Sequence, residues 1–320
     1  MSTRNTSIIV LTIAAVLSLS SAAGAAGLGD LLIDIAGYWD FDEATGLTLN
    51  DSAGVYNYNG VLSNFAALPT DDWWQAGVRG NSLDFDGIDS GVDFAPGVMP
   101  DMDQMSLSLW VRKENTEIGV MLYTDDPAWA DGDIHLRTNG DGNILSLIMN
   151  QGGEAGNNLV PPTPIATNGV DWTHVVLTYD RNNEASIYVN GVLDVSTTLT
   201  GDVPITYSKG FNLGNWYGAD RRWKGGMDEV GIWSRVLNAD DVANLYNGGA
   251  PINFFMSAGD VMHWDGDTGN WGDLAVHAAD SHWLIDGVTP TPDIPELGLP
   301  GTSGNVVIVG AGALTVAVDQ

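Results

Sequence analysis

The sequence predicts an all-β protein, a jelly-roll sandwich of two antiparallel sheets with one short C-terminal helix. Three observations support this fold class. Apolar and polar residues alternate over many short runs, which is the period of strands with one buried face. The 40 glycines among 320 residues favour frequent turns over long helices. Only one segment carries the signals of a helix.

The strands are expected at residues 38–41, 83–85, 106–111, 119–123, 134–137, 144–149, 173–179, 185–189, 192–195, 210–214 and 227–233. Asn190-Gly191 lies between two of them and predicts a hairpin turn. The helix is expected at 238–246, where Asn238 is a good N-cap and Asp241 follows three residues later. Gly248-Gly249 should end it.

Residues 1–26 have the pattern of a signal peptide. Arg4 supplies the positive start, Ile8 to Leu19 is apolar, and Ala22 to Ala26 offers small residues for cleavage. The protein is therefore expected to be secreted or at the cell surface, with an uncleaved anchor as the alternative. The chain has no cysteine, so a secreted form must be stabilised by its core, by calcium or by both.

The charge is strongly acidic. Forty-one acidic residues against 11 basic ones give a formal charge of −30, which disfavours nucleic acids and anionic membranes as partners. Such a surface suits divalent cations or a salty environment. The alternative is an acidic surface that serves only solubility.

The order of several motifs carries a family resemblance. These are Tyr38 to Glu43, Leu83 to Gly87, Ser106 to Val111, Asp171 to Val176 and Gly225 to Trp233. Together they resemble the laminin-G-like domain of the concanavalin A-like lectin/glucanase superfamily, and they are also similar to pentraxins. The resemblance implies a sandwich over residues 33–249 that serves in binding or adhesion.

Residues 251–320 differ in composition and are expected to form a small β-rich tail. Trp264-Asp265-Gly266 and Gly269-Asn270-Trp271 resemble the start of repeat segments in large bacterial surface proteins. Two further strands are expected at 305–309 and 313–318. The tail is interpreted as the start of a truncated repeat or solenoid domain.

No catalytic constellation is found. Laminarinase-type relatives carry Glu-x-Asp-x-x-Glu on one strand, which places paired carboxylates on one sheet face. That spacing occurs nowhere in the sequence. The protein is therefore expected not to be an enzyme.

Calcium is the cofactor that the resemblance implies, in a structural role. In glucanase-like sandwiches an ion joins the two chain ends, and Asp51 and Asp228 match those positions. In pentraxins a second region binds calcium, and Asp131 matches it, although Gly132 replaces the expected asparagine. The alternatives are a turn cap at Asp51, a backbone acceptor at Asp228 and a solvated loop at Asp131.

A ligand site is expected at one rim of the sandwich. Loop tryptophans beside polar residues can stack on sugar rings, and arginines can bind acidic groups. The expected ligand-binding residues are Trp129, Trp216, Arg221, Arg222 and Trp223. The expected partner is an extracellular polysaccharide, a glycan or a surface protein. The alternatives are an architectural spacer without a ligand, or an accessory module of a carbohydrate-active enzyme.

Overall fold

The computed structural model describes residues 31–54, 56–65, 72–124, 130–150, 155–181, 183–199, 203–216, 221–251, 262–264 and 283–285. The expected signal peptide, Trp129 and the strands expected at 305–309 and 313–318 lie outside these residues. Of the tail, the structure describes β17 (Met262–Trp264) and β18 (Trp283–Ile285), which pair antiparallel. No helix in the described ranges has the length and apolarity needed to cross a membrane.

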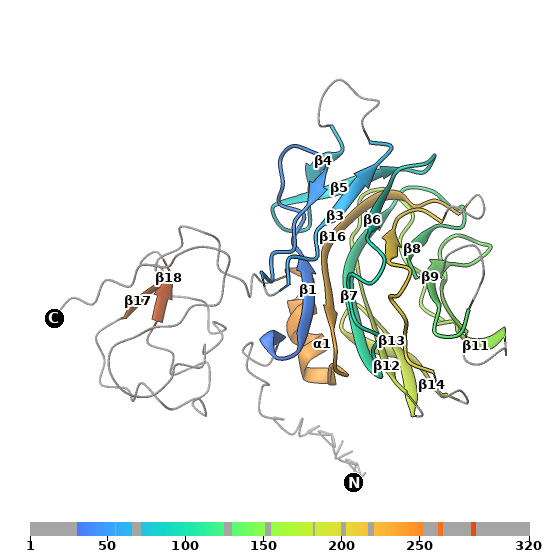
Figure 1. Cartoon of the computed structure of the whole chain (residues 1–320). Coiled ribbons are helices and arrows are strands. Elements are labelled where there is room, and N and C mark those ends of the chain that lie inside the picture. Colours follow the sequence, from blue (N-terminus) through green and yellow to red (C-terminus); the bar gives the residue numbers. More distant parts are fainter. Residues whose placement is uncertain are drawn as a thin grey trace, which may run out of the picture.

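The fold is a sandwich of two eight-stranded sheets (Figure 1). The first sheet, sheet A, contains β14 (Val192–Thr198), β13 (Glu184–Val189), β12 (Thr173–Asp180), β7 (Gln104–Lys113), β16 (Lys224–Trp233), β5 (Asn81–Asp86) and β4 (Trp74–Ala76) in that order, with β1 (Ile35–Trp39) paired to β16. The second, sheet B, contains β11 (Ala155–Leu159), β10 (Leu145–Asn150), β9 (Ile134–Thr138), β8 (Val120–Tyr123), β15 (Phe211–Leu213), β6 (Gly91–Phe94), β3 (Gly60–Ser63) and β2 (Thr48–Leu49). All their pairings are antiparallel, so the predicted fold class is confirmed.

The strands expected between residues 38 and 233 all lie within or beside observed ones. Seven observed strands were not expected: β2, β3, β4, β6, β11, β17 and β18. These strands have two to five residues, which is too short for an alternating pattern to stand out. The predicted hairpin is present, because Asn190 and Gly191 both have positive φ angles of 49° and 79° between β13 and β14.

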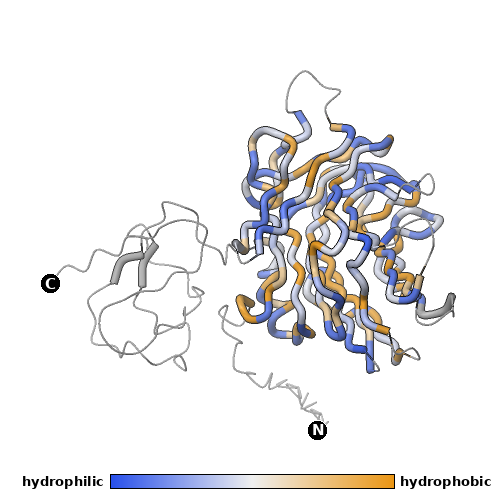
Figure 2. The backbone as a smooth tube through the Cα atoms, viewed as in Figure 1, coloured by the Kyte–Doolittle hydropathy of each residue, from blue (hydrophilic) through white to orange (hydrophobic). Residues whose placement is uncertain are grey.

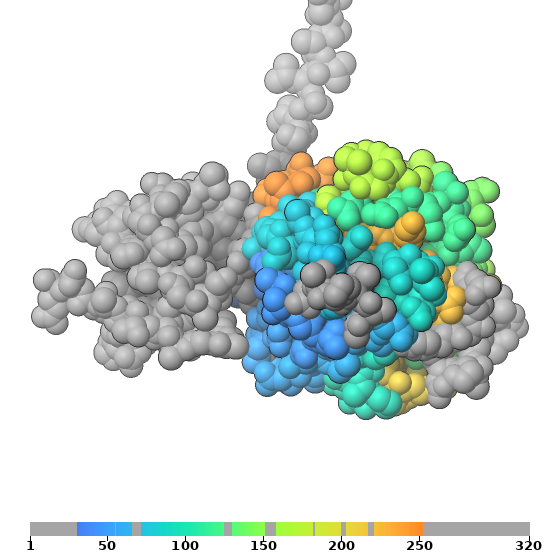
Figure 3. Space-filling view, turned by 90° about the horizontal axis from the view of Figure 1, so that it is seen from above, coloured from blue at the N-terminus to red at the C-terminus, as the bar shows by residue number. Residues whose placement is uncertain are grey.

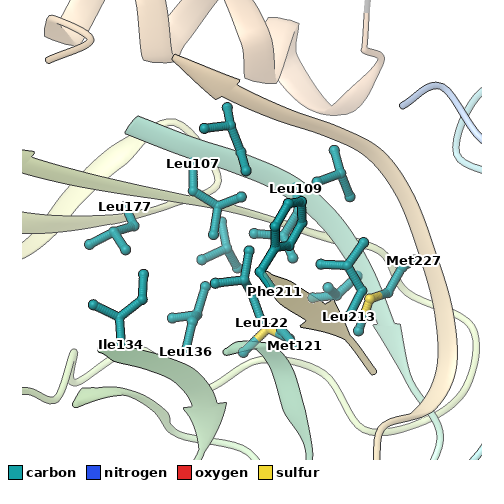
Figure 4. Packing of buried hydrophobic residues seen from close by; sticks show 14 of the residues in the cluster. Leu107, Leu109, Met121, Leu122, Ile134, Leu136, Leu177, Phe211, Leu213 and Met227 are labelled. Atoms are coloured by element: carbon teal, nitrogen blue, oxygen red, sulfur yellow. The ribbon is translucent and has the colours of Figure 1, made fainter. Parts of the chain in front are cut away.

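The main core lies between the two sheets. Leu107 and Leu109 of β7 project from sheet A toward Leu136 of β9 and Phe211 of β15 in sheet B (Figure 4). All four side chains are at most 4% exposed. Hydrophobic residues accordingly concentrate in the strands and hydrophilic ones in the connections (Figure 2).

A second, smaller cluster covers the outer face of sheet A. The helix α1 (Ala239–Tyr246) begins at Asn238, whose side chain accepts from the backbone N–H of Asp241 while the Asp241 carboxylate accepts in return. Val242 and Leu245 of α1 are buried against this face. In Figure 3 the helix, in orange, lies against the body of the sandwich. The predicted helix and its cap are therefore confirmed.

Candidate functional site

The outer face of sheet B carries a group of aromatic and basic side chains. In β9, Ile134 and Leu136 point into the core and are fully buried. Because side chains alternate along a strand, His135 and Arg137 point to the opposite, outer face. His135 pairs with Tyr123 of β8 across the sheet, and their rings meet edge to face at 5.8 Å. β8 and β9 lie side by side in Figure 1.

Trp216 lies over this face from the segment that follows β15. Its ring meets the His135 ring edge to face at 5.3 Å, and the Arg221 guanidinium stacks 4.7 Å from its centroid. Trp216, Arg221 and Arg137 are all partly exposed, so their side chains retain accessible area. We call Tyr123, His135, Arg137, Trp216 and Arg221 the sheet B patch.

The predicted rim is reproduced only in part. Trp216 and Arg221 are neighbours, and Trp216 contacts His135, which follows the exposed Asp131 by four residues. Arg222 is half-buried. Trp129 is outside the described residues.

Trp223 does not have the predicted role. Its side chain is fully buried, and its indole N–H donates to the carbonyl of Gly226 at 3.3 Å. The ammonium group of the buried Lys113 lies 4.7 Å from its ring centroid. The expectation that Trp223 stacks on a ligand is therefore wrong, because the ring belongs to the core and a change there would alter folding.

The patch includes three residues that were not predicted: Tyr123, His135 and Arg137. The sequence contained a signal for two of them. Ile134 and Leu136 define the inward face of one strand, so His135 and Arg137 had to share the other face. The position of Tyr123 depends on a register shift in β8 between Val120 and Leu122, which alternation alone does not predict.

The Asp51 side chain is a hydrogen-bond acceptor for backbone N–H groups. One of its carboxylate oxygens accepts from the N–H groups of Tyr38 and Ala53, both at 3.1 Å, and the other accepts from Tyr58 at 3.0 Å. Burial raises the pKa of Asp51, and the N–H donors of Tyr58 and Ala53 partly lower it. The carboxylate therefore ties three chain segments together as a turn acceptor.

Asp228 has the same role in β16. Its Oδ2 accepts from the backbone N–H groups of Val78 at 2.9 Å and Arg79 at 3.3 Å, and its Oδ1 accepts from Glu229 at 2.8 Å. A register shift follows Asp228, and Glu229 has a φ of 51°, so both acids are buried instead of alternating between faces. The Glu229 carboxylate pairs with Arg79 at 2.6 Å. Burial raises the pKa of Asp228 to about 8.

These contacts do not fit the predicted calcium ion. Calcium is coordinated by six to eight oxygens, whereas both carboxylates are surrounded by N–H donors. Asp51 and Asp228 also bind separate segments and share no partner. Within the described residues, no three His, Asp or Glu side chains form a group suited to a metal. The expectation of a joint Asp51–Asp228 site is therefore not supported.

Two other polar features have structural explanations. A cleft of about 500 Å³ is lined by residues 100–104, Asp180, Arg181 and Ser234, but its acids already bind neighbouring side chains, as in the Arg181–Asp103 ion pair. Ser108 and His174 form a hydrogen bond of 2.8 Å. Both are buried, so this pair has no access to a substrate.

Comparisons with known proteins agree with this architecture. Residues 86–243 match the family model described as the concanavalin A-like lectin/glucanases superfamily. C-reactive protein 1.4 of Limulus polyphemus is 22% identical over 179 residues, covering 53% of this chain and 72% of that protein.

Two solved structures are also similar. The botulinum neurotoxin serotype D ligand-binding domain, in complex with N-acetylneuraminic acid, is 14% identical at a TM-score of 0.51, covering 74% of this chain and 58% of that one. Domain 4 of the Geobacillus stearothermophilus arabinanase, in complex with arabinotriose, is 25% identical at a TM-score of 0.48, covering 67% of this chain and 98% of that one. Together, the family match and the two-sheet topology confirm the predicted resemblance of the β-sandwich to the concanavalin A-like lectin/glucanase superfamily.

Proposed function

We propose that the sandwich is a secreted, non-catalytic module that binds an extracellular carbohydrate on the sheet B patch. The observation that carries the proposal is the stack of Arg221 on the partly exposed Trp216, above His135. Aromatic rings bind the apolar faces of sugars, while arginine donates to their oxygens. The family description, which names lectins and glucanases, supports a carbohydrate over other ligands.

The absence of Glu-x-Asp-x-x-Glu from the sequence supports binding without hydrolysis. A surface protein remains the alternative partner, and an architectural domain without a ligand remains the alternative function. In this proposal the sandwich binds a polysaccharide outside the cell, and residues 251–320 form a separate part of the protein that does not bind it.

Trp216→Ala is expected to weaken polysaccharide binding about tenfold, which corresponds to about 1.4 kcal/mol. The melting temperature should stay near that of the wild type, because the ring is only partly buried. Affinity electrophoresis against neutral and acidic polysaccharides measures the first effect, and thermal melting measures the second. Tyr56→Ala is the matched control, since Tyr56 is an exposed ring (57%) outside the patch.

Three results would contradict this proposal. One is that the wild type binds no polysaccharide, and another is that Trp216→Ala binds as well as the wild type. The third is the release of reducing ends from a bound polysaccharide, which would indicate catalysis.

The second part of the proposal is calcium support at the turn before β9. Asp131 is exposed there, and the Asp133 carboxylate accepts from the N–H of Ala130 at 2.6 Å, which holds the turn in place. An exposed carboxylate on an ordered turn is the kind of oxygen ligand that calcium uses. The turn also lies at the start of the strand that carries His135 and Arg137.

Calcium is expected to raise the melting temperature over that in chelator, and Asp131→Asn is expected to remove the difference. A ligand at a hundredfold excess over its Kd stabilises the native state by about 2.7 kcal/mol. For a domain of this size that is a shift of several degrees. Asp141→Asn, on another exposed turn, is the control. Coincident melts with and without calcium would refute this part of the proposal.

A further inference from the structure

Arg137 and Arg221 differ from four of the other arginines that the structure describes in how their charge is balanced. Arg79, Arg112, Arg181 and Arg235 each form an ion pair with a carboxylate. Within the described residues, Arg137 and Arg221 form none, in a chain with 41 acidic residues. The Nε of Arg137 is also buried without a hydrogen-bond acceptor.

Arg137 and Arg221 lie on neighbouring parts of the chain, because the carbonyl of Arg221 accepts from the N–H of Val120 at 3.1 Å and Val120 pairs with Arg137 across β8 and β9. Burial lowers the pKa of Arg137, and the charge of Arg221 lowers it further. Two like charges on one partly desolvated face are unfavourable unless a counter-charge joins them. The counter-charge could be a carboxylate of the chain itself, which has 41 acidic residues. Among the described residues, however, no Asp or Glu forms an ion pair with Arg137 or Arg221.

The geometry favours an anion as the missing partner. Trp216 holds the Arg221 guanidinium against its ring face, so less side-chain entropy is lost when the arginine binds. A stacked guanidinium keeps its N–H groups at its edge, where they can donate two parallel hydrogen bonds to a carboxylate or a sulfate. Arg137 lies on the neighbouring strand face and adds a second cation.

We infer that Arg137 and Arg221 select saccharides that carry a carboxylate or sulfate group, so that the sheet B patch is specific for acidic glycans. This inference rests on the proposed carbohydrate binding. The charge of −30 does not prevent it, because salt screens exposed charges beyond about 8 Å at physiological ionic strength.

The test compares trigalacturonate with its methyl ester, which has the same sugar skeleton without the negative charges. Calorimetric titration should show that the wild type binds the acid at least tenfold more tightly than the ester. A sulfated galactan oligosaccharide is the third ligand, and it distinguishes sulfate from carboxylate as the recognised group. Tighter binding of either anionic ligand than of the ester supports the inference.

Arg137→Gln and Arg221→Gln should each weaken binding of the anionic ligands about tenfold more than they weaken binding of the ester, because only the anionic ligands lose a charge-assisted hydrogen bond. Arg181→Gln is the matched control, because it removes the same charge from a side chain whose ion pair with Asp103 lies at the separate cleft. Melting curves identify any variant that has lost its fold, and the Arg221 variant tests the inference if Arg137 is needed for folding.

The failures of the two proposals are distinguishable. If acid and ester bind equally, and Trp216→Ala and the arginine variants each change the binding of acid and ester to the same extent, the selectivity is overturned and carbohydrate binding stands. If neither the three oligosaccharides nor the polysaccharide panel binds, both proposals fail.

Discussion

Asp228→Ala is expected to lower the free energy of unfolding by about 3 to 5 kcal/mol. The substitution removes the acceptor of three backbone N–H groups, those of Val78, Arg79 and Glu229. Each buried donor left without a partner costs about 1–3 kcal/mol. Asp228 is fully buried, so water cannot readily replace the carboxylate. Denaturant unfolding followed by tryptophan fluorescence measures the change.

Two comparisons isolate the cause. Asp228→Asn keeps only one acceptor oxygen and turns an amide donor toward the N–H groups, so it should also destabilise the protein. Asp141→Ala, on an exposed turn, should change stability by less than about 0.5 kcal/mol. If Asp228 acts through the backbone, its loss costs the same in calcium and in chelator. A cost that appears only in calcium would instead identify Asp228 as an ion ligand.

The strands were predictable where one face of a long strand is apolar. Leu107 and Leu109 alternate with Ser106 and Ser108, and this pattern placed β7 correctly. The serines are nevertheless buried: the Ser106 hydroxyl bonds to the segment that leads into α1, and the Ser108 hydroxyl bonds to His174. Alternation thus identifies the two faces of a strand, but it does not reveal which layer covers the second face.

The candidate site was harder to predict, since its members meet through tertiary contacts. Trp216 was correctly associated with Arg221, which is five residues away in the chain. Trp223 was assigned to the same surface because charged residues flank it, yet it is covered by Lys113, which is 110 residues away. Long-range coverage of this kind leaves no local pattern in the sequence.

The β-bulge in β16, between Asp228 and Gly231, likewise could not be predicted from the local sequence pattern. A regular strand would place Asp228 and Glu229 on opposite faces, and one of them would then be available to an ion. The register shift and the positive φ of Glu229 bury both instead. The resemblance to glucanases suggested a calcium ligand at Asp228, whereas its contacts identify a backbone acceptor.

His174→Gln is expected to make the protein less sensitive to acid than the wild type. His174 is fully buried beside the rings of Trp110 and Tyr246, at centroid distances of 4.9 and 6.0 Å. Its Nε2 bonds to the Ser108 hydroxyl, while its Nδ1 has no acceptor among the described residues. Burial lowers the pKa of His174 to about 3, because a charged imidazolium would be poorly solvated there.

The sign follows from proton binding in the two states. Between pH 6.5 and pH 3 the unfolded chain binds a proton at His174 and the folded protein does not, so stability falls as the pH is lowered. From pH 6.5 to pH 4 this loss is about 3 kcal/mol, at 1.36 kcal/mol for each pH unit.

Burial raises the pKa of Asp228 and Glu229, and their contribution to the pH dependence of stability has the opposite sign, since acid favours the folded state. Both proteins share that contribution, so it cancels when guanidinium unfolding of the wild type and His174→Gln is compared at pH 7 and pH 4. Equal pH dependence in the two proteins would show that protonation of His174 does not limit acid stability, whereas a shallower dependence in the variant ties acid sensitivity to the layer between sheet A and α1.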